Sequence, residues 1–351
     1  MILIFDPNPP YLSWCKAEGD KYSEGICPFD IGWFDKVAGE IGSIETIESI
    51  GYVLHHGGEI IKNPVEIISS GTIKNLEKCI KFFPEYNDIT FKVVERFIKK
   101  VPGIKHILFC DTAFFVDLPQ EISTYAVPYE LQKRGIRRFG RQGLCHQWAW
   151  SKIKGLSGQS INRAISIYLG NNSTMAAIEN GRPRETSVGF TNIEGIISAT
   201  SCGDIDPTII FQLHATGMPL KAINRVLSIE SGFGAILDKK SEFLDILKSK
   251  KGSKEVALRE IYCYNILKYS GAFVSILGGA DALIFINEKI KDAVPLISNI
   301  SRELAFLGVK FKENPGANKA IFDLTAKDSP VKIYCLRYNK WDILINLAKE
   351  A

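Results

Sequence analysis

The chain lacks several patterns that mark special classes of protein. Its 8 cysteines, spread over 351 residues, include no Cys-x-x-Cys pair, which disfavours both a zinc ribbon and a disulfide framework. No run of about 18 apolar residues occurs, so we expect no membrane-spanning helix. The apolar start MILIF has no basic flank and is interrupted at once by Asp6 and Pro7, which argues against a signal peptide. We therefore expect a cytoplasmic protein.

An excess of one charge is also missing. The 43 Lys and Arg residues are interleaved with 39 Asp and Glu residues, and the formal net charge is +4. This balance gives little support to a nucleic-acid partner, and we expect none. With 46% hydrophobic and 23% charged residues, the composition is that of an ordinary globular protein. The length exceeds what one hydrophobic core usually supports, which predicts two domains.

Hydrophobic patterns in the first third predict alternating strands and helices. Apolar runs over 1–5, 51–61 and 106–110 indicate buried strands, the last of them ending at Asp111. Between them, apolar residues from 91 to 101 recur at helical spacing. This alternation favours an α/β architecture.

A second unit is expected to begin near residue 116. Residues 165–170 and 175–181 flank the turn NNST and indicate a hairpin, and 281–287 indicates a further strand. The apolar stretch 254–277 predicts a long helix in the core or at a subunit interface, and the last residues, KWDILINLAKEA, predict a short helix. No internal repeat or low-complexity linker is visible.

Three blocks of sequence carry a resemblance to a known family. GYVLHHGGE (51–59) is similar to the motif GHRVVHGGE, and HILFCDTAF (106–114), followed by a GIRRFG stretch, is similar to a block containing FDTAFH and GIRRYG. The stretch from IYLGNNST to SCGDIDP (167–207) resembles a signature that runs from HLGNGAS to RSGDIDP. The family that carries these motifs is the acetate kinase family, which includes propionate and butyrate kinases.

This resemblance implies a fold and a reaction. It implies an α/β fold of two ribonuclease-H-like (actin-like ATPase) domains with a cleft between them. The first domain would comprise 1–115 plus 340–351, and the second, 116–339, would carry dimerisation helices. The family reaction is ATP-dependent phosphorylation of a short-chain carboxylate to an acyl phosphate. It implies ATP and Mg²⁺ as cofactors, a small carboxylate as substrate and a second copy of the chain as partner.

The resemblance also assigns candidate site residues, without naming a metal ligand. The candidate catalytic residues are Asp111, Arg141, Gln142 and His146. The candidate nucleotide-binding residues are Gly170, Asn171, Gly203, Asp204 and Asp206. The candidate residues of the acceptor pocket are Val53, His55, His56 and Asn192. Some of these have an alternative interpretation. His146 is also typical of a buried core histidine, and Asp204 and Asp206 are also typical of caps for a helix starting at Pro207.

Several positions that carry chemistry in the family hold other residues here. The first phosphate loop contains Asp6 and three prolines, which remove N–H donors. Val53 and Ser201 stand where the family has arginines, and Gln142 stands where it has a histidine. The adenosine loop at 286–291 lacks glycine, and Lys340 lies in the region where the family supplies a carboxylate for Mg²⁺.

Three hypotheses follow from these departures. The first is a degenerate acetate-kinase-like protein, inactive or weakly active as a kinase, that binds or scaffolds. The second is an enzyme with changed chemistry, in which Arg141 is a replacement cation and Cys110, Cys145 and Cys202 form a reactive or metal-binding cluster beside His146. The third is an ordinary short-chain carboxylate kinase whose missing groups come from other positions.

Overall fold

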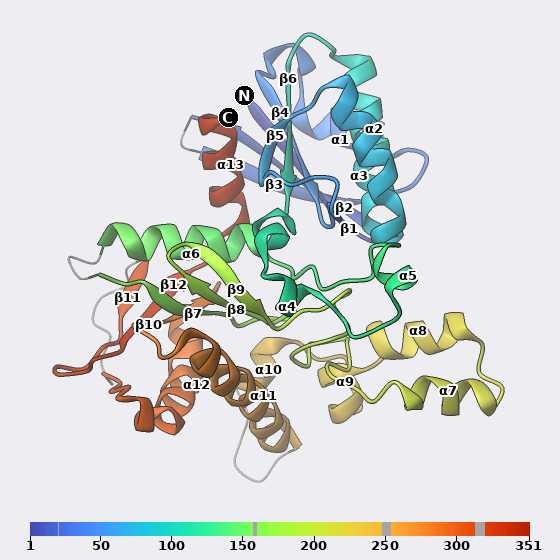
Figure 1. The fold of residues 1–351 in the computed structure, drawn as a ribbon. Helices are drawn as coiled ribbons and strands as arrows, with labels where there is room; N and C mark the ends of the chain where they lie inside the picture. The colour runs from blue at the N-terminus through green and yellow to red at the C-terminus, as the bar shows by residue number, and fades with distance from the viewer. Residues whose placement is uncertain (20, 157–159, 248–253, 313–319) are drawn as a thin grey trace. The chain divides into compact units, whose positions relative to one another are not determined.

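Two mixed six-stranded sheets form the framework, one in each of two units (Figure 1). The computed structural model describes the chain apart from residues 20, 157–159, 248–253 and 313–319. Unit 1 comprises Met1–Val116, Arg141–Cys145 and Asn339–Ala351, and unit 2 comprises Asp117–Gly140 and His146–Tyr338. The short segment 141–145 therefore groups with unit 1, inside the range expected for the second domain.

The sheet of unit 1 has the strand order β3-β2-β1-β4-β6-β5. Its strands are β1 (Ile2–Asn8), β2 (Tyr11–Glu18), β3 (Lys21–Pro28), β4 (Ser49–Leu54), β5 (Val65–Ile67) and β6 (Lys105–Cys110). The first three are antiparallel neighbours, and β4 and β6 run parallel to β1. The predicted strands at 1–5 and 106–110 are confirmed, and β2 and β3 were not predicted.

The strand predicted over 51–61 is wrong beyond Leu54. After β4 the chain turns, because the carbonyl of Gly57 accepts hydrogen bonds from the N–H groups of Ile60 and Ile61 at 3.2 and 3.0 Å. Gly58 adopts φ +57°, a conformation that glycine tolerates best. The apolar residues at 60 and 61 belong to this turn and not to the strand.

Side chains of β1 alternate between two layers of helices. Leu3 and Phe5 pack in the cluster that includes α1 (Trp33–Ile41), α2 (Ser70–Cys79) and α3 (Pro84–Lys100). Ile4, on the opposite face, packs with α13 (Lys340–Glu350), the predicted C-terminal helix. Both faces of the sheet are therefore covered by helices, as Figure 1 shows for α3 and α13.

The sheet of unit 2 repeats this plan, with the order β11-β12-β10-β7-β8-β9. Its strands are β7 (Arg163–Tyr168), β8 (Thr174–Glu179), β9 (Arg182–Thr186), β10 (Ala282–Asn287), β11 (Ile321–Asp323) and β12 (Lys332–Arg337). Here β7, β8 and β9 are antiparallel neighbours, and β10 and β12 run parallel to β7. The predicted hairpin and the predicted strand at 281–287 are confirmed.

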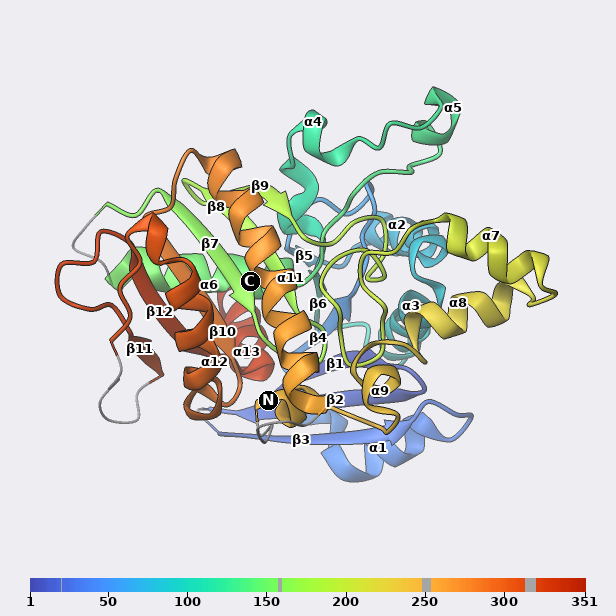
Figure 2. The same ribbon diagram turned by 90° about the horizontal axis from the view of Figure 1, so that it is seen from below.

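Helices cover both faces of this second sheet as well. The helices from here on are α4 (Gln120–Ser123), α5 (Tyr129–Gln132), α6 (Gly143–Leu156), α7 (Thr208–Ala215), α8 (Leu220–Ser228), α9 (Gly232–Leu237), α10 (Phe243–Leu247), α11 (Lys254–Leu277) and α12 (Ile290–Glu303). Of these, α11 and α12 pack on one face of the sheet, and α6 lies on the other. Short 3₁₀ turns span Ile44–Thr46, Ile80–Phe82, Ala113–Asp117 and Ala305–Leu307. The long helix α11 has the predicted bounds and packs in the unit's main core (Figure 2). No helix in the described part of the chain is long and apolar enough to cross a membrane.

Candidate functional site

Polar side chains gather where the parallel strands of unit 1 end. Asp6 lies near the end of β1, His55 directly follows β4, and Asp111 directly follows β6. Because the carboxyl ends of parallel neighbours meet at one edge of a sheet, these residues converge there. The Nε2 atom of His55 lies 2.9 Å from Oδ1 of Asp6. This edge is the candidate site of unit 1.

Four side chains at this edge form a hydrogen-bonded series, which we name the charge chain: Arg141, His55, Asp6 and Lys340. Nη2 of Arg141 lies 3.0 Å from Nδ1 of His55. Since a guanidinium only donates, Nδ1 accepts, and the ring proton resides on Nε2, which donates to Asp6. Nζ of Lys340 donates to the other oxygen of Asp6 at 2.6 Å. Burial raises the pKa of Asp6, but the bond from His55 and the charge of Lys340 outweigh it and hold the pKa well below its usual range.

Two aromatic rings hold the guanidinium of Arg141. Its central carbon lies 5.0 Å from the ring centroid of Phe83 and 5.8 Å from that of Tyr86. The two rings stack on each other at 4.4 Å. Cation–π contacts of this kind contribute about 0.5–1 kcal/mol at exposed sites and more when water is excluded. Arg141 is thus oriented by contacts within unit 1.

Asp111 binds the turn that carries Arg141. Its Oδ2 accepts a hydrogen bond from the N–H of Gln142 at 2.7 Å, and its carbonyl accepts one from Gly143 at 3.1 Å. A Cβ at Gly143 would lie 2.4 Å from that carbonyl oxygen, so only glycine fits. Burial raises the pKa of Asp111, and the charge of Arg141 offsets this in part. The turn is therefore pinned to the end of β6.

The two remaining pocket candidates of unit 1 are buried. Val53 is 6% exposed and packs in the core beneath α13. His56 accepts a hydrogen bond at Nδ1 from the N–H of Gly58 at 3.1 Å and stacks on Phe82 at 5.2 Å. Of the predicted acceptor pocket in unit 1, only His55 reaches the charge chain.

In unit 2, the nucleotide-binding candidates at the β7–β8 turn make hydrogen bonds to other residues of the same unit. The N–H of Gly170 donates to Oγ of Ser173 at 3.1 Å. Oδ1 of Asn171 accepts from the N–H of Phe243 at 2.7 Å, which ties the turn to the start of α10. The carbonyl of Asn192 accepts a bond from Ser201 at 3.4 Å.

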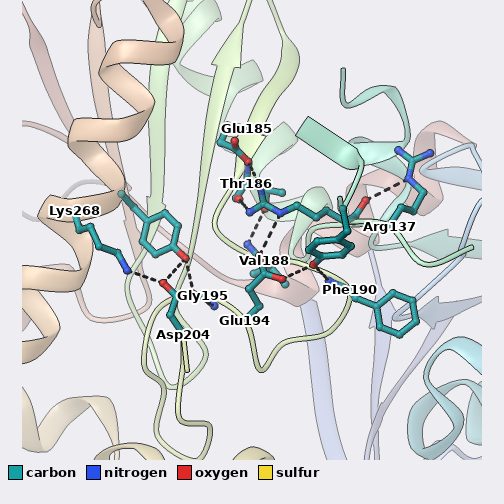
Figure 3. Close-up of polar contacts among 12 residues, drawn as sticks. Arg137, Glu185, Thr186, Val188, Phe190, Glu194, Gly195, Asp204 and Lys268 are labelled. Carbon is teal, nitrogen blue, oxygen red and sulfur yellow. Dashed lines mark hydrogen bonds and ion pairs between the residues drawn. The ribbon is translucent and has the colours of Figure 1, made fainter. Parts of the chain in front are cut away.

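Asp204 fastens the segment before α7 to helix α11 (Figure 3). Oδ2 accepts from Nζ of Lys268 at 2.6 Å, and both carboxylate oxygens lie within 3.0 Å of the hydroxyl of Tyr269. Oδ1 also accepts from the N–H of Gly195 at 2.9 Å. The carboxylate of Asp204 therefore crosslinks this segment to α11.

Gly203 and Asp206 serve the same segment. Gly203 adopts φ +73°, and a Cβ there would lie 2.8 Å from the carbonyl oxygen of Gly195. Oδ1 of Asp206 accepts from the N–H and hydroxyl of Thr208 at 2.9 and 2.7 Å. The predicted helix starts at Thr208 and not at Pro207. Asp206 binds the N–H of that first residue, whereas Asp204 binds Gly195 and α11 and caps no helix.

His146 is fully buried at 0% exposure near the start of α6. Its Nδ1 lies 2.7 Å from Oγ of Ser166, and its Nε2 lies 3.0 Å from Oγ1 of Thr174. Burial lowers the pKa of His146 to about 3. A neutral ring with a hydroxyl at each nitrogen crosslinks α6, β7 and β8.

The sequence matches a known family over most of its length. The model of the acetokinase family matches residues 34–346. The acetate kinase of Halothermothrix orenii is 32% identical over 314 residues, which cover 87% of this chain and 78% of that enzyme. The acetate kinase of Porphyromonas gingivalis is 31% identical over 307 residues, covering 85% and 77%. The chain belongs to the acetate kinase family.

Solved structures of acetate kinase family proteins share this fold. The crystal structure of Porphyromonas gingivalis acetate kinase has a TM-score of 0.86 at 24% identity and covers 98% of both chains. A propionate kinase from Francisella tularensis has a TM-score of 0.85 at 20% identity and covers 99% of this chain and 98% of its own. The predicted fold class of two ribonuclease-H-like domains is confirmed.

The cysteines of this acetate kinase family chain are poor nucleophiles. Burial raises the pKa of Cys110 to about 12, and it raises the pKa of Cys145 and of Cys202 as well. A thiolate is the reactive form, so these thiols remain protonated at neutral pH. Among the described residues, no three His, Cys, Asp or Glu side chains converge as a metal site requires. These observations oppose the hypothesis of changed chemistry through a cysteine cluster.

Unit 2 also contains an ionic network that was not predicted from the sequence. Arg138 donates to Oε1 of Glu185 at 2.8 Å and to the carbonyl of Thr186 at 2.7 Å, and its Nε lies 3.4 Å from Glu194. Tyr125 donates a hydrogen bond to Glu194. The GIRRFG block carries Arg138, but its partners lie 47 and more positions away, so no local pattern identifies them.

Proposed function

We propose that this acetate kinase family protein keeps the family fold but lacks efficient carboxylate kinase activity and acts by binding or scaffolding. The proposal is based on the surroundings of Val53 and Ser201, the two positions where the family has arginines. Val53 lies in a hydrophobic core. Ser201 is 1% exposed, and its hydroxyl pairs with that of Ser198 at 2.7 Å. Neither position supplies a cation.

Phosphoryl transfer depends on cations placed around the moving group. A guanidinium binds carboxylate or phosphate with two parallel hydrogen bonds, which valine and serine cannot form. Losing one such donor from a preorganised site costs about 2.7–4 kcal/mol of transition-state stabilisation. Losing both would lower the rate by several powers of ten.

The first phosphate-binding element supports the same proposal. Asp6, Pro7 and Asn8 lie within β1, and a two-residue turn, Pro9 and Pro10, leads into β2. The strand residues pair with β2, and the prolines have no N–H to offer. A phosphate group finds few free backbone donors in such a hairpin.

In the region that corresponds to the family's adenosine loop, the side chain of Asn287 is bonded to two backbone groups. Nδ2 of Asn287 donates to the carbonyl of Leu169 at 2.7 Å, and Oδ1 accepts from the N–H of Lys289 at 2.7 Å. Asn287 is 4% exposed, and α12 begins directly afterwards at Ile290. In the glycine-rich loop of the family the backbone itself approaches the nucleotide.

Thermal unfolding with and without nucleotide tests the proposal. MgATP or MgADP at millimolar concentration should leave the melting temperature unchanged. A ligand at 100 times its Kd would add about 2.7 kcal/mol and raise the melting temperature by several degrees. The acetate kinase of Porphyromonas gingivalis, 31% identical, serves as the positive control. A clear nucleotide-dependent shift would contradict the proposal.

Hydroxylamine trapping separates this proposal from the hypothesis of an ordinary kinase. Acetate, propionate and butyrate, each supplied with MgATP, should give no acyl hydroxamate above background. Turnover with any of them would favour an active short-chain carboxylate kinase. In that case Arg141→Ala tests whether Arg141 is the replacement cation, because unchanged turnover would exclude that role.

We further infer that the chain forms a homodimer through α7 and α8. These two helices lie side by side (Figures 1 and 2). No residue of α7 is buried, and its Ile209 and Phe211 are 41% and 70% exposed. Leu220 on α8 is 61% exposed. The family resemblance implies dimerisation through the second domain, and a second copy would cover this apolar surface.

A further inference from the structure

The charge chain at the strand ends of unit 1 bears on the divalent metal that the family reaction implies. Lys340 is the first residue of α13 and lies in the region where the family supplies a carboxylate for Mg²⁺. Its ammonium nitrogen lies 2.6 Å from Oδ2 of Asp6. Asp6 is buried, with its side chain 12% exposed, and lies near the end of β1.

Both oxygens of Asp6 have partners. Oδ2 accepts from Lys340, and Oδ1 accepts from Nε2 of His55 at 2.9 Å. The direction of the His55 bond is fixed, because Arg141 donates to the opposite ring nitrogen. Every hydrogen bond in the charge chain therefore leads toward Asp6, and each oxygen of this carboxylate already accepts one bond, one of them from a cationic ammonium group.

Mg²⁺ does not fit this arrangement. The ion needs near-octahedral oxygen ligands, and proteins usually supply one or two carboxylates. At this edge one carboxylate is committed and an ammonium lies beside it. Asp111, the other carboxylate of the edge, is engaged by the N–H of Gln142 at 2.7 Å. Among the described residues, no three His, Cys, Asp or Glu side chains lie close enough together to hold a metal ion.

The position of Lys340 is set by the start of α13. Oδ1 of Asn339 accepts from the N–H groups of Trp341 and Asp342 at 3.0 and 3.4 Å, which caps the helix. Trp341 is 3% exposed, and Nζ of Lys340 lies 4.4 Å from its ring centroid. These contacts hold the ammonium over the strand end.

We propose that Lys340 is a covalently attached substitute for the divalent cation, and that it excludes Mg²⁺ from the strand ends of unit 1. The site then keeps a positive charge without a metal, and any anion that binds there does so without one. This inference rests on the proposed loss of the family reaction. The test of this inference measures the binding of a metal ion without nucleotide. The role of Lys340 can therefore be disproved while the proposed loss of nucleotide binding holds, and the loss of nucleotide binding can be disproved while the role of Lys340 holds.

Mn²⁺ is the probe, because free Mn²⁺ gives an electron paramagnetic resonance signal that is lost on binding. The full-length wild type is compared with Lys340→Glu, which places a carboxylate beside Asp6, and with Lys340→Gln, which places a neutral amide oxygen there. Lys349→Glu, at an exposed position near the other end of α13, adds the same charge away from the site. Circular dichroism verifies that each variant is folded.

We expect the wild type and Lys349→Glu to bind no Mn²⁺ at millimolar concentration. Lys340→Glu should gain one Mn²⁺ site, about tenfold tighter or more than any binding by the wild type, with a smaller gain for Lys340→Gln. Stoichiometric Mn²⁺ binding by the wild type, unchanged in Lys340→Glu, would overturn the inference. So would absence of binding in both Lys340 variants, because another feature would then exclude the metal. If Lys340→Glu does not fold, Lys340→Gln decides between these outcomes.

Discussion

Burial decides what a chemically capable residue does in this protein. His146 and His55 are both histidines in family-like motifs, but their surroundings differ. His146 has no exposed surface and hydroxyl partners at both nitrogens. His55 is only partly buried and lies between a guanidinium and a carboxylate. The first crosslinks secondary structure, and the second belongs to the candidate site.

The buried ring of His146 predicts a pH dependence of stability. Its pKa of about 3 in the folded protein lies below the ordinary value of 6.5, so the unfolded chain binds a proton that the folded chain does not. Stability should therefore fall as the pH drops from about 6.5 toward 3, by up to about 1.4 kcal/mol per pH unit from this group. Urea unfolding of wild type and His146→Gln at several pH values measures the difference in slope. His214→Gln, at an exposed position, is the control, and equal slopes in all three proteins would contradict the assignment.

Thiol reactivity gives a second test at single residues. Cys110 and Cys145 are buried, whereas Cys202 and Cys263 are partly exposed. Burial raises the pKa of Cys110 to about 12 and that of Cys263 to about 11. We expect Cys110 and Cys145 to alkylate with iodoacetamide more slowly than the partly exposed pair in the native protein, as followed by mass spectrometry. Rapid alkylation of Cys145 would support the changed-chemistry hypothesis.

The segment between β9 and α7 is held by side chains of several elements. Arg138 bonds to Glu185 on β9 and to the carbonyl of Thr186, and Asp204 bonds to two residues of α11. Figure 3 shows these contacts on both sides of the segment. The segment matches a family signature, and these contacts show that its polar groups also hold the fold together.

Removal of Arg138 should therefore destabilise unit 2. Arg138→Met leaves Glu185, 10% exposed in its side chain, without its cation. Breaking a buried pair in this way costs about 3–5 kcal/mol. Arg137→Met is the matched control, because Arg137 makes a cation–π contact with Phe139 at 5.7 Å and should cost about 1 kcal/mol or less. Urea unfolding compares the two, and equal losses would show that the network is not the stabilising feature.

Both units of the molecule are built on one topology. In each sheet the first three strands are antiparallel neighbours. The next parallel strands are added beside the first strand of the three. Unit 2 differs by its long insertion between β9 and β10, which carries α7 to α11. The exposed apolar residues of α7 and α8 belong to this insertion, so any dimer surface there is a feature of unit 2 alone.

A charged residue on α7 should disrupt the proposed dimer. Phe211→Glu places a charge in an apolar surface that the second copy would cover, so we expect a monomer by size-exclusion chromatography with light scattering, where the wild type gives a dimer. Phe306→Glu is the control, because Phe306 is 77% exposed elsewhere in unit 2. A wild-type monomer would contradict the inferred dimer, and a dimeric Phe211→Glu would contradict the interface.

The sequence predicted those helices and strands whose own residues show a clear hydrophobic pattern. The helix α11 has its predicted bounds, 254–277, because a long apolar stretch has no competing interpretation. β2 and β3 escaped prediction. β2 is buried on both sides, so it lacks simple alternation, and β3 is mostly exposed, so it lacks an apolar run. The turn at Gly57 shortened the predicted strand for a similar reason, since apolar residues alone do not mark where a strand ends.

The α/β class and membership of the acetate kinase family could be read from the sequence alone, because both depend on which residues occupy the motifs. What the residues of these motifs contact depends on the tertiary structure. Arg141, His55, Asp6 and Lys340 are separated by up to 334 positions, and the parallel strands bring them to one edge. Hydrogen bonds among such distant residues depend on strand order and packing, which no local pattern encodes.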